Sequence, residues 1–188
     1  PPPPLHNMAN PTQTLAIHPV PVWPDIVLAL TYRRVPLAER EPGPLRFHWM
    51  IYVPNKNDWT TGIRLHPSAP SGVWQFEAAQ YSLPYAKSLA AAAVIGTLRE
   101  GFNYNRLYDI LSQIPTHVPE VDYFNEPRFT ARVWAREALR RLHNAGFINC
   151  PYITVMEAEM MFYGEGAVQA MDAEQFTQAQ LRRATHST

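Results

Sequence analysis

The chain has 188 residues, of which 46% are hydrophobic and 12% aromatic, which is enough for one packed core. Sixteen basic residues balance sixteen acidic ones, so the charge supports neither a surface that follows nucleic-acid phosphates nor a strong attraction to anionic membranes. No run of eighteen apolar residues and no secretory signal pattern is present. We therefore expect a cytoplasmic protein without a membrane partner.

Cysteine usage narrows the chemistry further. The single cysteine, Cys150, cannot form an internal disulfide, and no group of Cys and His residues has the spacing of zinc ligands. Cys150 follows a helix-ending glycine and has no basic residue beside it, which is typical of an idle thiol. We expect neither a metal nor a cofactor.

The domain organisation follows from the distribution of proline. Residues 1–7 precede Met8 and are interpreted as vector-derived, and residues 8–24 form a proline-rich N-terminal segment. The remaining residues, 25–188, are predicted to form a single domain. Its first half contains segments of strand length that are rich in aromatic and β-branched residues. Strands are predicted over 25–34, 45–54, 60–66 and 71–77, and over 91–98 with a helix as the alternative.

The second half has helical spacing of its apolar residues. Helices are predicted over 104–114, which Pro115 ends, and over 128–146, which Gly146 ends. Two acidic stretches within 154–183, separated by glycines, are also interpreted as helical. The order of strands first and helices after them predicts an α+β fold, with an antiparallel meander packed against helices.

Two histidines fall on adjacent predicted strands. The segments around His48 and His66 form a predicted hairpin, in which residues of neighbouring strands stand side by side on one face if the register agrees. A pair of imidazoles can act as an oriented base that activates a nucleophile. A half-buried packing role is the alternative for each histidine taken alone.

The ordered motifs FHWMIYVP, GIRLH, GVWQFE and RFTARVWAREALRRLHNAGFI are similar to those of an uncharacterised fungal protein family. Members of that family carry His-Trp on a strand, a second histidine, and a helix that opens with Phe-x-Cys-x-x-Trp. The order of His, His and a helix-borne Cys also resembles the permuted papain-like superfamily, which includes lecithin–retinol acyltransferase relatives and NlpC-type peptidases. The likeness spans roughly residues 26–160 and implies a permuted papain-like fold.

The resemblance assigns four positions. His48 corresponds to the strand histidine, His66 to the second polar position, Trp134 to the helix tryptophan, and Ala131 to the cysteine nucleophile, which this chain lacks. The alanine is interpreted either as a replacement introduced at the active cysteine or as a natural residue of an inactive relative, and the alternative is a small helix former packed against the sheet. If Thr130 caps the helix, residue 131 lies in the first turn, where the helix dipole would lower the pKa of a thiol. A cap at Asn125 would instead put residue 131 in the second turn.

Aromatic and polar residues near these motifs are candidates for substrate binding, with core packing as the alternative for the aromatic ones. The candidates are Trp49, Trp74, Glu77, Thr130 and Trp134.

The first functional hypothesis is a cysteine-nucleophile hydrolase or acyltransferase, present here in an inactive Cys-to-Ala form. It would form a thioester intermediate from an amide, ester or aminoacyl substrate, as in fungal secondary metabolism. The expected partner is a small-molecule or peptide acyl substrate, and an aminoacyl-tRNA donor stays open although the charge does not support nucleic-acid binding. The second hypothesis is a catalytically dead ligand- or protein-binding module with the same fold.

Overall fold

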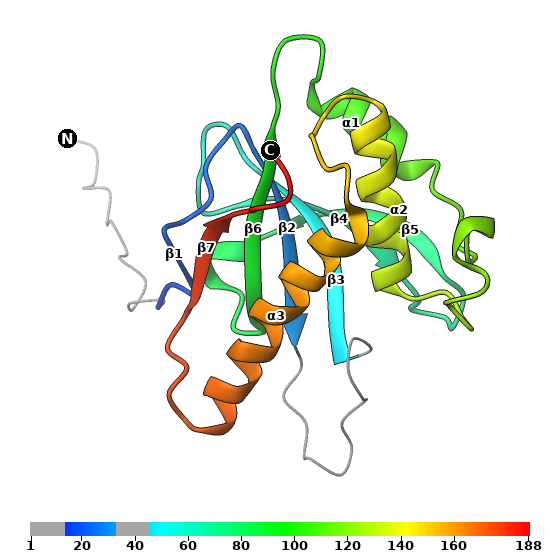
Figure 1. The fold of residues 1–188 in the computed structure, drawn as a ribbon. Coiled ribbons are helices and arrows are strands. Elements are labelled where there is room, and N and C mark those ends of the chain that lie inside the picture. Colours follow the sequence, from blue (N-terminus) through cyan, green and yellow to red (C-terminus); the bar gives the residue numbers. More distant parts are fainter. Residues whose placement is uncertain (1–13, 33–45) are drawn as a thin grey trace.

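The computed structural model describes residues 14–32 and 46–188, which form one mixed sheet with helices on one of its faces (Figure 1). The strand order is β1-β7-β6-β2-β3-β4-β5. The strands are β1 (Ile17–His18), β2 (Asp25–Tyr32), β3 (Phe47–Pro54), β4 (Gly62–Ser68), β5 (Gln75–Tyr81), β6 (Leu89–Thr97) and β7 (Ala179–Arg183). The helices are α1 (Tyr104–Ser112), α2 (Ala131–Asn144) and α3 (Ile153–Asp172), with 3-10 turns η3 (Leu83–Tyr85) and η4 (Glu120–Asp122).

The α+β prediction is confirmed at this level. Strands β2 to β5 are consecutive neighbours with antiparallel pairing, which is the expected meander, and β6 adds antiparallel to β2. The sheet is not wholly antiparallel, because β7 runs parallel to both β6 and β1. Ile17 of β1 is fully buried, so the proline-rich segment contributes to the sheet edge. Residues 1–13, 33–34 and 45 of the predicted elements lie outside the described part of the chain.

Two sequence predictions are wrong. The strand expected over 71–77 begins only at Gln75, after a turn that includes Gly72 with a positive φ of 82°. The helical interpretation of 154–183 holds only as far as Asp172, since residues 179–183 form β7. Helix α3 also continues through Gly164, where the missing side chain lets the backbone approach the Phe47 ring closely.

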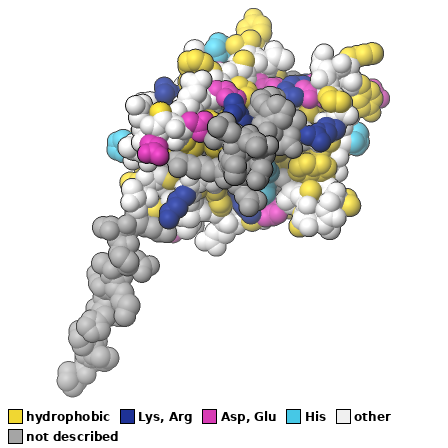
Figure 2. Space-filling model, turned by 90° about the horizontal axis from the view of Figure 1, so that it is seen from below, with side chains coloured by type: hydrophobic (Ala, Val, Ile, Leu, Met, Phe, Trp, Pro, Cys, Tyr) yellow, Lys and Arg dark blue, Asp and Glu magenta, His cyan; other side chains and the backbone are white. Residues whose placement is uncertain are grey.

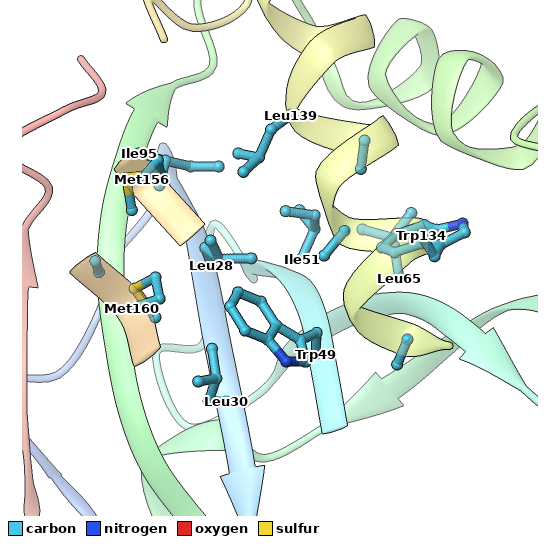
Figure 3. Close-up of a cluster of buried hydrophobic side chains, with 14 of the residues drawn as sticks. Leu28, Leu30, Trp49, Ile51, Leu65, Ile95, Trp134, Leu139, Met156 and Met160 are labelled. Carbon is cyan, nitrogen blue, oxygen red and sulfur yellow. The ribbon is translucent and has the colours of Figure 1, made fainter. Parts of the chain in front are cut away.

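The sheet separates two hydrophobic clusters. Because side chains alternate along a strand, Trp49 and Ile51 of β3 face the helices, whereas Met50 and Tyr52 face the opposite side. Figure 3 shows the helix-side cluster, in which Trp49 lies between the sheet and side chains from α2 and α3. The labelled members are Leu28, Leu30, Trp49, Ile51, Leu65, Ile95, Trp134, Leu139, Met156 and Met160.

Helix α2 is held in place by a buried ion network. Arg136 is only 7% exposed and contacts Asp122 at 3.0 Å, Glu126 at 2.8 Å and Glu157 at 2.7 Å. A buried guanidinium is tolerated only when such partners satisfy its charge. These contacts connect α2 to the loop before it and to α3, so they fix the position at which α2 begins.

No helix within the described residues is long and apolar enough to cross a lipid bilayer. On the face drawn in Figure 2, basic and acidic side chains are interspersed wherever residues are described, as the zero net charge suggests.

Replacement of Gly62 by alanine is expected to destabilise the protein. A β-carbon at position 62 would lie 2.5 Å from Tyr52 Cζ and still closer to the backbone oxygen of Val53, so the β3–β4 hairpin would have to shift. We expect a loss of about 1–3 kcal/mol in the free energy of unfolding, measured by urea denaturation.

Gly166→Ala is the matched control for this substitution. Gly166 lies in α3 with open space around it, so alanine there should leave stability unchanged or raise it by up to about 1 kcal/mol. Equal stability of Gly62→Ala and the unaltered protein would contradict the close packing of this hairpin.

Candidate functional site

The two predicted histidines meet on the sheet. His48 of β3 and His66 of β4 lie on the same face, with His48 Nε2 2.7 Å from His66 Nδ1. Their rings are nearly perpendicular, at 89°, and their centroids are 4.8 Å apart. His66 is only 4% exposed, while His48 is half-buried. One imidazole therefore reaches the surface, and the other lies beneath it as a hydrogen-bond partner.

Polar residues of β4 and β5 surround the buried imidazole. Glu77, directly opposite His66 in the strand register, has its Oε1 3.7 Å from His66 Nε2. Arg64, two residues before His66 on the same face, donates from Nη2 to the same Glu77 oxygen at 3.2 Å. The guanidinium of Arg64 also stacks over the Tyr81 ring at 5.0 Å. These contacts make a polar site of His48, His66, Glu77 and Arg64, which we call the imidazole site.

Both imidazoles favour the neutral form. Burial, followed by the charges of His66 and Arg64, lowers the pKa of His48 to about 4, although Glu77 acts in the opposite direction. Burial and Arg64 also lower the pKa of His66. The pKa of the Glu77 carboxyl is lowered as well, through the Ser68 hydroxyl and the neighbouring His66 and Arg64. At neutral pH the site therefore combines two uncharged imidazoles with an ionised carboxylate.

The carboxylate indicates how the protons are arranged. Ionised Glu77 can only accept hydrogen bonds, so it favours a proton on the facing Nε2 of His66. His66 Nδ1 then accepts from His48 Nε2, which leaves the lone pair of His48 on its Nδ1. Among the described residues, His66 Nε2 forms no direct hydrogen bond, since 3.7 Å is an ion-pair distance. We infer that Glu77, His66 and His48 form a chain of polar contacts in this order. The chain ends near the surface at His48 Nδ1, which carries a free lone pair and is therefore the basic nitrogen.

Position 131 lies on the other side of the sheet. Thr130 caps α2 by accepting from the backbone N–H of Val133, so residue 131 occupies the first turn and the alternative cap at Asn125 is wrong. Ala131 is 6% exposed and belongs to the helix-side cluster with Trp49 and Trp134. His48 alternates with Trp49 along β3 and so points away from that cluster. The fold therefore brings His48 and His66 together but does not bring either imidazole to Ala131.

The predicted aromatic residues are mostly core residues. Trp49 and Trp134 are fully buried on the helix side, where Trp134 stacks with Phe76 at 6.3 Å. Trp74, which directly precedes β5, packs edge-on against Phe129, with 5.5 Å between the ring centroids. They do not line the imidazole site, and of the expected substrate-binding residues only Glu77 belongs to it. Thr130 serves as the helix cap described above.

Sequence reasoning missed Arg64. The signal was its spacing, because Arg64 and His66 are two residues apart and must share a strand face. No group of three His, Cys, Asp or Glu side chains in the described ranges could hold a metal ion. Cys150 is buried and its pKa is raised to about 11, chiefly by burial, as an unreactive thiol requires.

Comparisons with known proteins give no match for this chain: no family model, no curated protein and no solved structure is significantly similar to it.

The lowered pKa values predict that stability decreases as the solution is acidified. An unfolded histidine has its ordinary pKa near 6.5, so between pH 6.5 and about 4 the unfolded chain binds more protons than the folded one. The stability contributed by the neutral pair is fully present above pH 6.5 and is lost progressively toward pH 4. Urea denaturation at pH 7, 6 and 5 should show a smaller decline for His48→Gln than for the unaltered protein.

His117→Gln, at an exposed histidine outside the site, is the matched control and should decline as the unaltered protein does. A decline that is the same in all three proteins would contradict the assignment of acid sensitivity to the imidazole pair.

The separation of the two faces predicts the behaviour of a thiol at position 131. In Ala131→Cys the pH midpoint of alkylation by iodoacetamide should not change when His48→Gln is added, because the sheet lies between the two side chains. Mass spectrometry of the labelled peptide distinguishes this thiol from Cys150. An upward shift of about one pH unit on loss of His48 would instead show a thiol–imidazole pair.

Proposed function

We propose that this protein is a hydrolase or acyltransferase in which His48 acts as the general base and water or a substrate amine is the nucleophile. The observation that carries the proposal is the 2.7 Å contact between the two imidazoles, with Glu77 behind the buried one. A base oriented by a second group, which is itself held by a carboxylate, is a recurring arrangement in acyl-transfer catalysis. Here His48 is the catalytic residue, and His66 and Glu77 are positioning residues.

The proposed reaction begins with proton abstraction. His48 Nδ1 removes a proton from the attacking water or amine. At the same time the oxygen of that water, or the nitrogen of that amine, bonds to the acyl carbon, and the π electrons of the carbonyl group move onto the carbonyl oxygen. The imidazolium that forms is stabilised through His66 by the charge of Glu77. The intermediate then expels its leaving group, which takes the proton from His48 Nδ1 and restores the neutral base.

The low pKa of His48 limits the substrates. A group with a pKa of about 4 is a weaker base than an ordinary imidazole and, once protonated, a stronger acid. Because it activates the attacking water or amine only weakly, it suits acyl donors that are already activated. Esters, thioesters and aminoacyl esters fit this requirement better than ordinary amides.

The permuted papain-like assignment is part of the proposal. The chain order of a histidine strand, a second histidine strand and a capped helix beginning at residue 131 supports it. The location of Ala131 behind the sheet does not favour a thioester at this position, because no imidazole faces it. For this reason we assign the attack to a nucleophile that the substrate or solvent brings.

A catalytically dead ligand-binding module is the second candidate. It is favoured by the neutral state of both imidazoles, which suits hydrogen bonding more than proton transfer. Such a module would use the same imidazole site to hold a polar ligand.

Hydrolysis of p-nitrophenyl acetate tests the first candidate. The unaltered protein should hydrolyse the ester faster than buffer, with a rate that rises with pH through about 4 as His48 loses its proton and then levels off. His48→Gln should lower the protein-dependent rate by about 100-fold or more. His66→Asn and Glu77→Gln should retain part of the rate, because they remove orientation rather than the base.

His117→Gln serves as the control and should retain the full rate. If the unaltered protein and His48→Gln hydrolyse the ester equally fast, His48 is not the base, and the binding module becomes the better explanation.

A further inference from the structure

The outermost strand of the sheet contains no buried residue. Strand β5 is the last in the sheet order and pairs only with β4 among the described strands (Figure 1). Gln75, Ala78 and Gln80 are exposed, even though Ala78 lies in the middle of the strand. In an edge strand the backbone N–H and C=O groups on the outer side have no strand partner, and they can pair with another chain.

Strand β5 carries only one of the features that usually prevent such pairing, the charged residue Glu77. Its seven residues, QFEAAQY, contain no proline and no lysine, and their register with β4 runs without a bulge from Gly62–Tyr81 to Ser68–Gln75. The opposite edge of the sheet is formed by β1, which has only two residues. Natural proteins commonly protect long edges with charges, prolines or bulges. The outer side of β5 is therefore suited to pair with a further strand.

We propose that β5 pairs antiparallel with β5 of a second copy of this chain, so that one continuous sheet runs through both subunits. The two copies would be related by a two-fold axis perpendicular to the sheet, as in most symmetric dimers. The axis would pass beside Ala78, so that Ala78 lies opposite the same residue of the second copy.

The sequence of β5 favours this register. Ala78 is the centre of Gln75–Tyr81, so the register overlaps all seven residues. Glu77, the only charged residue of the strand, then lies opposite Ala79 of the second copy and not opposite another carboxylate. Moving the axis by one residue to Glu77 would oppose the two like charges. A two-fold axis normal to the sheet also keeps the helices of both copies on the same face.

Packing inside each subunit prepares the strand for pairing. The Phe76 ring packs against the rings of Trp134 and Tyr108, with centroid distances of 6.3 Å and 5.6 Å. The Tyr81 ring lies under the guanidinium of Arg64. Because these side chains are already ordered, association would cost little further conformational entropy. A second copy also carries a strand of matching length and polarity, which an arbitrary extended peptide does not.

Charge substitutions at the proposed axis test the dimer by light scattering or analytical ultracentrifugation. The unaltered protein should approach twice its 21.4 kDa mass with increasing concentration. Ala78→Lys and Ala78→Glu should each be monomeric, since each puts like charges opposite one another. An equimolar mixture of the two variants should recover the dimer mass, which misfolding of either variant would not allow.

Gln169→Lys, at an exposed position of α3, makes a similar charge change away from β5 and should leave the dimer intact. A monomer at every concentration of the unaltered protein would overturn the proposal, as would a dimer that persists in Ala78→Lys. The same holds if the unaltered protein stays monomeric and binds an added β5 peptide instead.

Discussion

Burial of Trp49 and its neighbours on β3 determines where the rest of the molecule can lie. Trp49, Ile51 and Val53 must face the helices to complete the larger core, and alternation along the strand then directs His48 to the opposite face. A shift of the register by one residue would exchange the faces, removing the indole from the larger core and burying the imidazole under α2. The cost of losing this packing fixes the register, and the register fixes the face of the sheet on which His48 lies.

The same constraint explains how much of the candidate site could be predicted. The pairing of His48 with His66 follows from two strands joined by a short hairpin, and the first-turn location of residue 131 follows from the Thr130 cap. The position of residue 131 relative to the histidine pair could not be derived. The spacing of apolar residues in α2 shows which side of the helix is apolar, but it does not show which face of the sheet the helix covers. Only the completed core of Trp49 and Trp134 decides that.

The fold was predictable where local pattern and tertiary packing agree. The alanines of β6 left strand and helix open in the sequence, and the structure resolves them as a strand between β2 and β7, where small side chains let α3 approach. Residues 179–183 were misassigned because all five residues of AQLRR are good helix formers, although pairing with β6 makes the segment a strand. Gly164 likewise indicates a close contact with Phe47 and not a break in the helix. In each case a distant part of the chain overrides the local preference.

The parallel pairing of β1 with β7 affects how the protein is made. Ile17 lies beside Ala179, so one margin of the sheet joins segments that are far apart in the sequence. During synthesis the hairpins from β2 to β5 can form as they leave the ribosome, whereas Ile17 must wait until β7 has been made. A nascent chain that stops before β7 would leave Ile17 and one edge of β6 without a strand partner, so such truncated products would be prime targets for chaperones and proteases.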